Sequence, residues 1–154
     1  MNEIKRIASF EVDHNKLDRG LYISRVDGDI TTYDMRMRRP NSDDYLSDVA
    51  MHTFEHMLAT FIRSGPLASD IIYAGPMGCR TGFYLLVRNA DDHAVWQELR
   101  RVMQCIIDHE GEVFGQSAVE CGNYLCLELG SAKTEAEAYL AVLGDSCPDF
   151  KYNK

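Results

Sequence analysis

The sequence has no long apolar run and no surplus of basic residues, and each absence excludes a class of function. No uninterrupted apolar stretch approaches the ~20 residues that a membrane-spanning helix needs. The chain carries 16 lysines and arginines against 24 aspartates and glutamates, a formal charge of −8, whereas nucleic acids and anionic membranes are bound by basic patches. We therefore expect no nucleic-acid partner and no membrane partner.

The first residues lack the apolar core expected of a signal peptide, and the chain lacks an even set of cysteines. Residues 1–7 turn polar at once and have no apolar signal core, and the chain has five cysteines. Disulfide frameworks of secreted domains use even numbers of cysteines, and the cytosol keeps thiols reduced. The expectation is a cytoplasmic protein in which a cysteine serves as a packing residue, a ligand or a catalyst.

Length and patterning predict one domain over residues 1–154. The hydrophobic content of 45% is enough to bury a core in a chain of this size. Residues 21–26 and 30–37 read as strands joined by a hairpin turn at Gly28. Alternation in the second strand puts apolar side chains on one face and polar ones, Arg36 included, on the other face, where an arginine usually meets solvent. Further strands are expected at residues 71–74 and 82–87.

Three segments have helical periodicity. The first is expected to run from a cap at Ser42 or Asp43 to about Arg63, and the others cover residues 92–109 and 131–143. Strands and helices alternate without a linker. The predicted fold is therefore α+β: a single domain with one antiparallel sheet and helices packed on it.

The most informative stretch is a His-x-x-Glu-His pentad, His52 to His56, inside the first predicted helix. His52 and His56 lie one helical turn apart, so both imidazoles can reach one metal ion. Glu55 lies beside that face, placed to move protons without being a ligand. This residue order occurs in inverzincin peptidases. Because paired histidines are also common on exposed helix faces, the pentad alone leaves metal binding open.

A catalytic metal site needs a third protein ligand and an open position. Cys121 and Cys126 both compete for that role, since a thiolate suits zinc or ferrous iron. Cys121 precedes Gly122, which would let the backbone come close to the site. Cys126 lies in the apolar run 125–127 and is better explained as a core residue.

Cys79 is the other candidate for chemistry. It lies between Gly78 and Gly82, in a turn that can present a side chain rather than bury it. Arg80 beside it, or a nearby metal ion, would favour the reactive thiolate. A buried, inert thiol in a tight turn is the alternative. His14 by itself indicates no more than a surface histidine on a strand.

Five blocks of the sequence resemble the LuxS family of S-ribosylhomocysteine lyases, bacterial enzymes that make the precursor of autoinducer-2, a quorum-sensing signal. The blocks share the family's order and similar spacing, from about residue 8 to residue 135. Each block is moderately specific, and their conjunction is highly specific. They are Ser9 to His14, Tyr33 to Arg36 with Pro40-Asn41, His52 to His56 with Leu58-Ala59, Pro76 to Tyr84, and Glu120 to Asn123.

The resemblance implies one divalent metal ion per subunit, held by His52, His56 and Cys121. Fe²⁺ (ferrous iron) is the expected metal, which Zn²⁺ or Co²⁺ can replace. The resemblance also implies that Glu55 and Cys79 form the catalytic acid–base pair.

By the same resemblance, Ser9, His14 and Arg36 line a substrate pocket, and the other subunit of a homodimer supplies them, so that the active sites lie at the interface. The chain departs from the family at Tyr73-Ala74-Gly75, where an Asp-Ile-Ser run is usual. Because the lost carboxylate belongs to the pocket wall, we expect Tyr73 and Ala74 to reshape the end of the pocket that takes the amino-acid part of the substrate.

The implied reaction cleaves S-ribosylhomocysteine to homocysteine and 4,5-dihydroxy-2,3-pentanedione through ring opening, two carbonyl shifts and a β-elimination. Two other interpretations stay open. An inverzincin-type metallopeptidase would use Glu55 to activate a metal-bound water, but it normally has an acidic third ligand. The other is a metal-binding family member with an altered substrate or with lost activity.

Overall fold

Alternating side chains and two short turns build an antiparallel sheet, as the sequence predicts. The computed structural model describes residues 2–152, and its sheet has the order β1-β2-β4-β3 with every neighbouring pair antiparallel. The hairpin turn contains Gly28, whose φ of +61° favours glycine. The strands of the described residues are β1 (Gly20–Asp27), β2 (Ile30–Arg36), β3 (Ile71–Pro76) and β4 (Gly82–Arg88).

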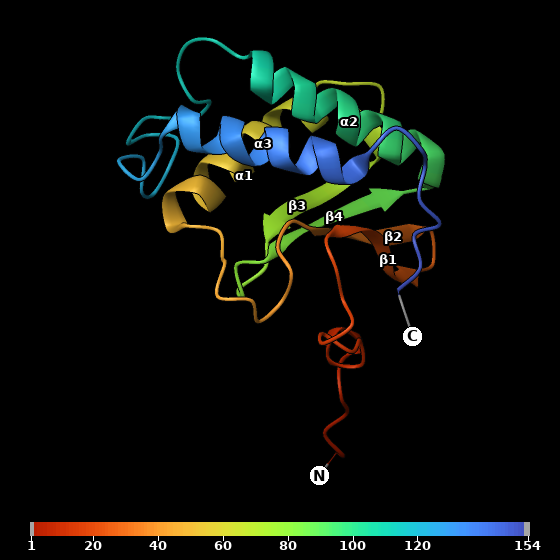
Figure 1. The fold of residues 1–154 in the computed structure, drawn as a ribbon. Coiled ribbons are helices and arrows are strands. Elements are labelled where there is room, and N and C mark those ends of the chain that lie inside the picture. Colours follow the sequence, from red (N-terminus) through yellow and green to blue (C-terminus); the bar gives the residue numbers. More distant parts are fainter. Residues whose placement is uncertain (1, 153–154) are drawn as a thin grey trace.

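Three helices in the described part of the chain cover one face of this sheet (Figure 1). They are α1 (Asp48–Ile62), α2 (Asp92–Asp108) and α3 (Leu129–Leu143). Tyr33 and Met35 of β2 are fully buried in the same apolar core as residues of the three helices. The α+β fold predicted from the sequence is thus confirmed. Among residues 2–152, no helix combines the length and the apolarity needed to cross a membrane.

Helix α1 begins later than the sequence indicated. Asn41 and Asp43 have φ values of +56° and +60°, so the chain still turns where the cap at Ser42 or Asp43 was expected. The cap is Ser47, whose hydroxyl oxygen accepts a hydrogen bond from the Ala50 amide at 3.1 Å. The polar residues before it belong to a loop, because their side chains satisfy the backbone of turns as readily as that of helices.

Packing of α1 determines where its pentad points. Phe54, Met57 and Leu58 are fully buried beneath the helix, and the Phe54 ring lies 5.0 Å from that of Phe83 on β4. The remaining face of this helix is therefore turned toward the loop between α2 and α3. The pentad's two histidines and its glutamate lie on that half-buried side.

The polar face of β2 does not meet solvent, contrary to the expectation for Arg36. Asp34 and Arg36 are only 1% and 3% exposed. The C-terminal segment passes beside β1, where the Phe150 carbonyl accepts a hydrogen bond from the Ile23 amide at 2.8 Å. Two residues further on, the Tyr152 hydroxyl donates a hydrogen bond to the Asp34 carboxylate. A chain segment remote in sequence thus contacts the buried pair on the polar face.

Candidate metal centre and active site

His52, His56 and Cys121 come together, as the sequence predicted. Their ligand atoms all lie within 4.8 Å of one another, and each residue is half-buried. The histidines project from consecutive turns of α1, and the cysteine lies on the loop that precedes α3. This group could hold a metal ion.

Main-chain carbonyls orient both imidazoles. The Nδ1 atom of His52 lies 3.0 Å from the Cys126 carbonyl oxygen, and that of His56 lies 2.7 Å from the Phe114 carbonyl oxygen. Because a carbonyl oxygen can only accept, each Nδ1 carries the proton and donates it. The Nε2 lone pair of each ring is left free for a metal ion, as in most histidine metal sites.

One of the ligand–ligand distances matches the value expected around a tetrahedral ion. Ligand atoms held about 2.0–2.3 Å from such an ion lie about 3.4–3.6 Å from each other. The Nε2 atom of His52 and the sulfur of Cys121 are 3.4 Å apart. The Asn123 amide lies 3.4 Å from the same sulfur and donates to it, which stabilises the thiolate that a metal requires. Two imidazoles and one thiolate suit zinc, ferrous iron and cobalt alike.

Glu55 borders a cavity of ≈ 390 Å³ next to the ligands, together with His52, Pro76 and Asn123. It lies outside the group of potential ligands. A half-buried carboxylate on the wall of a cavity beside a metal site is available for proton transfer to a bound molecule.

The loop between α2 and α3 differs from the sequence prediction at Cys126 and at Gly122. Cys126 is half-buried and borders the same cavity rather than the core, and the preceding Leu125 is 82% exposed. Its main-chain carbonyl, not its thiol, serves the site. A side chain added at Gly122 would meet no atom within 4 Å, so this glycine does not provide a close backbone approach.

The glycine that the site needs is Gly115, which the sequence analysis missed. Its φ is +73°, and a Cβ atom there would lie 3.1 Å from Nδ1 of His56. The preceding residue, Phe114, supplies the carbonyl that orients that ring. Neither residue type indicates a metal site by itself, so only the folded loop identifies them.

Cys79 is exposed on the turn between β3 and β4, so the alternative of a buried thiol is wrong. Arg80 has a φ of +61°, and its guanidinium lies over the Tyr45 ring at 5.7 Å from the ring centre. The Cys79 sulfur lies 3.0 Å from the Thr81 hydroxyl oxygen, which also accepts a hydrogen bond from Arg36 at 2.7 Å. Arg36 and Cys79, far apart in sequence, therefore belong to one polar network.

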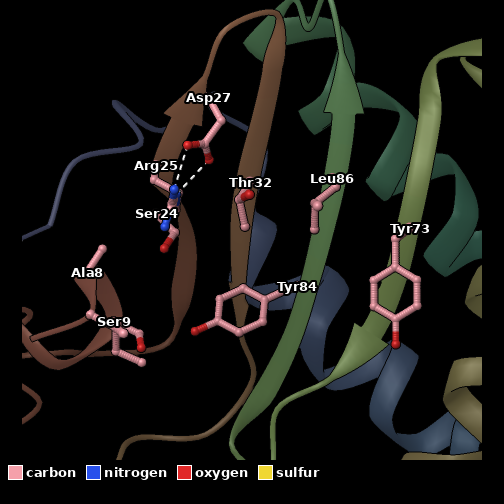
Figure 2. A pocket seen from close by; sticks show the side chains of 10 residues that line it. Ala8, Ser9, Ser24, Arg25, Asp27, Thr32, Tyr73, Tyr84 and Leu86 are labelled. Carbon is pink, nitrogen blue, oxygen red and sulfur yellow. Dashed lines mark hydrogen bonds and ion pairs between the residues drawn. The ribbon is translucent and has the colours of Figure 1, made fainter. Parts of the chain in front are cut away.

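A second cavity, of ≈ 470 Å³, lies on the sheet face away from the helices (Figure 2). Side chains from all four strands and from the short helix η1 (Ala8–Phe10) border it, Ser9 and Tyr73 among them. Burial raises the pKa of Tyr84 in this cavity. The ring of Tyr73 lies against Gly75, where a Cβ atom would come within 2.2 Å of the tyrosine oxygen. Ala74 is 5% exposed and faces the core, so only its main chain can contribute to a pocket.

The structure thus does not bring all the predicted site residues into one group. The cavity of Glu55 and the cavity of Ser9 share no residue. His14 lies in a turn rather than on a strand, and its Nδ1 atom donates to the Val12 carbonyl at 2.9 Å. Within one chain, Ser9 and Tyr73 are therefore separate from the cavity beside the candidate metal centre, whereas Arg36 is joined to Cys79 through Thr81.

Comparison with known proteins finds strong similarity. A family model described as S-Ribosylhomocysteinase (LuxS) matches residues 7–146. A protein of Phocaeicola vulgatus is 43% identical over 143 residues, which cover 89% of this chain and 89% of that protein. A protein of Finegoldia magna is 40% identical over 147 residues, which cover 92% of this chain and 94% of that protein. A protein of Porphyromonas gingivalis is 41% identical over 156 residues, which cover 97% of this chain and 98% of that protein. All three are named S-ribosylhomocysteine lyase.

The geometry of the loop between α2 and α3 predicts that Gly115→Ala weakens metal binding. The new methyl group strains the backbone and pushes against His56, so we expect metal affinity to fall by about 10-fold or more. Competition with a chromogenic chelator measures this affinity. Gly122→Ala is the matched control, because its methyl group has free space. Equal affinities for the two variants would contradict the role given to Gly115.

Proposed function

The chain belongs to the S-ribosylhomocysteinase (LuxS) family, and on this premise we propose that it cleaves S-ribosylhomocysteine to homocysteine and 4,5-dihydroxy-2,3-pentanedione, the autoinducer-2 precursor. The observation that carries the proposal is the convergence of two imidazoles and one thiolate beside a carboxylate in a chain that the family model matches over residues 7–146. The lyase domain is proposed to span residues 1–154. A metallopeptidase is not favoured, because the third ligand is a thiolate and the relatives are lyases.

In this proposal His52, His56 and Cys121 hold one divalent metal per subunit, Fe²⁺ in the first place, with Zn²⁺ or Co²⁺ as substitutes. When bound, the metal supplies a Lewis acid that stabilises negative charge on the sugar oxygens. The Nδ1–H bonds of the two histidines to carbonyl oxygens support this assignment, because they leave both Nε2 atoms free for a metal ion.

Glu55 and Cys79 move the protons. Each carbonyl shift takes a proton from one carbon and returns one to the neighbouring carbon, so no electrons leave the substrate. In the final step a base removes the proton next to the ketone, the carbon–sulfur bond breaks, and homocysteine leaves with a proton. Two groups on different sides of the sugar are enough for these transfers. The exposed thiol and the cavity-lining carboxylate support this division of labour.

The substrate pocket is proposed to be completed in a homodimer, where Ser9, His14 and Arg36 of one subunit approach the metal centre of the other. The separation of these residues from the cavity of Glu55 supports this arrangement. The N-terminal segment extends away from the body of its own chain (Figure 1). Apolar side chains on it are exposed, including 97% of Ile4 and 61% of Phe10. Such exposure favours burial against a second copy.

A cytoplasmic location completes the proposal. All five cysteines are free thiols, which agrees with a reducing compartment.

The decisive experiment measures homocysteine release from S-ribosylhomocysteine by protein loaded anaerobically with Fe²⁺ or Co²⁺, with mass spectrometric detection. We expect Cys79→Ala and Glu55→Gln to lower kcat by about 10²- to 10⁴-fold with metal content unchanged, since each removes a proton carrier. Cys147→Ala, which removes another exposed thiol, serves as the control and should keep full activity. Full metal occupancy without homocysteine release would instead indicate an altered substrate or lost activity.

Tyr73 is proposed to reshape the amino-acid end of the pocket, in place of the carboxylate usual in the family. Tyr73→Asp should lower KM for S-ribosylhomocysteine by about 10-fold, because a carboxylate can bind the substrate ammonium group. Tyr73→Asn separates this charge effect from loss of the ring. An unchanged KM for the aspartate variant, or the same decrease for both variants, would refute the idea.

Subunit mixing tests the shared site. His14→Ala and Glu55→Ala protein, each expected to be nearly inactive, are co-expressed with different tags. Half of the resulting dimers contain one intact site out of two, so the mixture should regain about one quarter of wild-type activity. If each subunit carried a complete site, mixing would restore nothing.

A further inference from the structure

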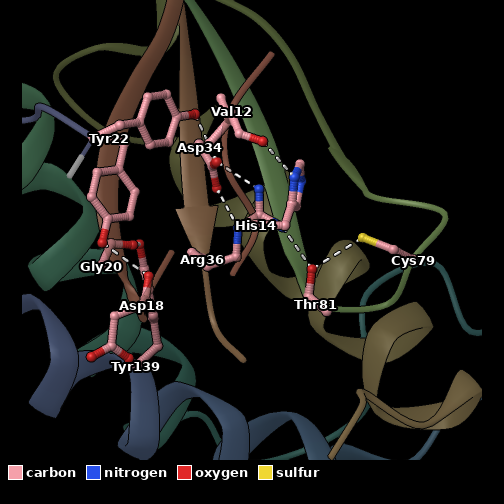
Figure 3. A network of polar contacts seen from close by, with 11 residues as sticks. Val12, His14, Asp18, Gly20, Tyr22, Asp34, Arg36, Cys79, Thr81 and Tyr139 are labelled. Atoms are coloured by element: carbon pink, nitrogen blue, oxygen red, sulfur yellow. Dashed lines mark hydrogen bonds and ion pairs between the residues drawn. The ribbon is translucent and has the colours of Figure 1, made fainter. Parts of the chain in front are cut away.

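An unbroken series of hydrogen bonds connects the C-terminal segment to the exposed thiol, and Figure 3 shows its central part. Tyr152 donates to the Asp34 carboxylate at 2.8 Å. Arg36 binds that carboxylate with two nitrogens, at 2.7 and 3.1 Å. Its third nitrogen donates to the Thr81 hydroxyl oxygen at 2.7 Å, and this oxygen lies 3.0 Å from the Cys79 sulfur.

The direction of each bond follows from the groups involved. A guanidinium has donors only, so the oxygen of Thr81 accepts from Arg36. A thiolate can only accept, so the single hydrogen of the Thr81 hydroxyl is directed at the sulfur when Cys79 is deprotonated. Burial, reinforced by the neighbouring Asp34 carboxylate, raises the pKa of Tyr152, so this hydroxyl keeps its proton and acts as a donor. With Cys79 in its thiolate form, the series therefore ends in an O–H group that donates to the sulfur.

Burial makes this arrangement rigid. Asp34, Arg36 and Thr81 are 1%, 3% and 2% exposed. Burial by itself would lower the pKa of Arg36, but the adjacent Asp34 carboxylate outweighs this effect and the pKa is raised. The guanidinium thus stays charged. A buried charge pair tolerates no missing partner, because water cannot replace a lost hydrogen bond there.

The C-terminal segment is held where it can supply Tyr152. The Phe150 carbonyl accepts from the Ile23 amide, and the Tyr152 ring stacks on Tyr22, with ring centres 4.9 Å apart and an angle of 19°. The Tyr22 hydroxyl donates elsewhere, to the Asp18 carbonyl at 2.9 Å. Of the two stacked rings, therefore, only Tyr152 bonds to the buried ion pair.

We propose that Thr81 and Tyr152 are positioning residues for Cys79. Thr81 orients the sulfur and stabilises its thiolate form by donating a hydrogen bond, and Tyr152 keeps the Asp34–Arg36 pair in the orientation that directs this hydroxyl. A thiol that takes and returns protons needs one fixed position relative to the substrate. The inference rests on the proposed function only in assigning those proton transfers to Cys79.

The test uses the metal-loaded enzyme with two measurements: steady-state kinetics, and the rate at which iodoacetamide alkylates Cys79, followed by peptide mass spectrometry. Thr81→Val should lower kcat and the alkylation rate by about 10- to 100-fold each, with KM within about twofold of wild type, because a bond to a charged sulfur is lost. Thr81→Ser keeps the hydroxyl and should restore most of both rates.

Tyr152→Phe should lower both rates by about 3- to 10-fold, as expected for one outer hydrogen bond. Tyr22→Phe is the matched control, since it removes a hydroxyl from the same stacked pair and should leave both rates unchanged. Equal losses in the two variants, or wild-type rates for Tyr152→Phe, would overturn the proposed role of Tyr152. A Thr81→Val protein with a wild-type alkylation rate would overturn that of Thr81.

The two measurements separate this inference from the proposed function. If wild-type protein releases no homocysteine, yet alkylation of Cys79 still depends on Thr81 and Tyr152, the positioning role stands and the lyase assignment fails. If wild-type turnover is normal but neither substitution changes the alkylation rate or kcat, the lyase assignment stands and the positioning role fails.

Discussion

The alternation of side chains along β2 is the constraint on which the rest of the molecule depends. This strand lies inside the sheet, so its odd-numbered residues enter the core under the helices and its even-numbered residues enter the opposite face. Asp34 and Arg36 on that second face are buried as an ion pair. Burying two charges is unfavourable unless every donor and acceptor is satisfied. The partners come from the turn after β3 and from the C-terminal segment, which the pair thereby fixes in place.

Burial of one face likewise determines what helix α1 presents, namely the two histidines of the candidate metal centre. Its buried side, centred on Phe54, packs on the sheet, so its half-buried side must present His52 and His56. The orientation of the two rings then depends on carbonyl groups of the loop between α2 and α3. That loop also supplies Cys121. The candidate metal centre is consequently a contact between one helix and one loop, and its ring orientations come from main-chain atoms that carry no sequence signature.

Local sequence patterns predicted much of the candidate metal centre and of helix α1. The His-x-x-Glu-His spacing placed two imidazoles on one helix face, and the group that could hold a metal ion contains Cys121, the preferred candidate, rather than Cys126. The reason given for that preference was wrong, because Gly122 faces open space whereas Gly115 makes the close approach. Helix periodicity located α1 but not its start, since the residues before Ser47 satisfy turns. Such competition between a turn and a helix is decided by the neighbouring chain, not by propensity.

By itself, the sequence determined the α+β architecture, the pentad on one face of a helix and the resemblance to one family of lyases, because periodicity and motif spacing are local properties of a chain. Only the tertiary structure decided that Arg36 is buried and that Cys79 is exposed. It also decided which main-chain carbonyls orient the histidines, and that Tyr152 reaches Asp34. These contacts join residues 45 to 118 positions apart. Burial and partner choice at such separations depend on how the whole chain packs, which no local pattern encodes.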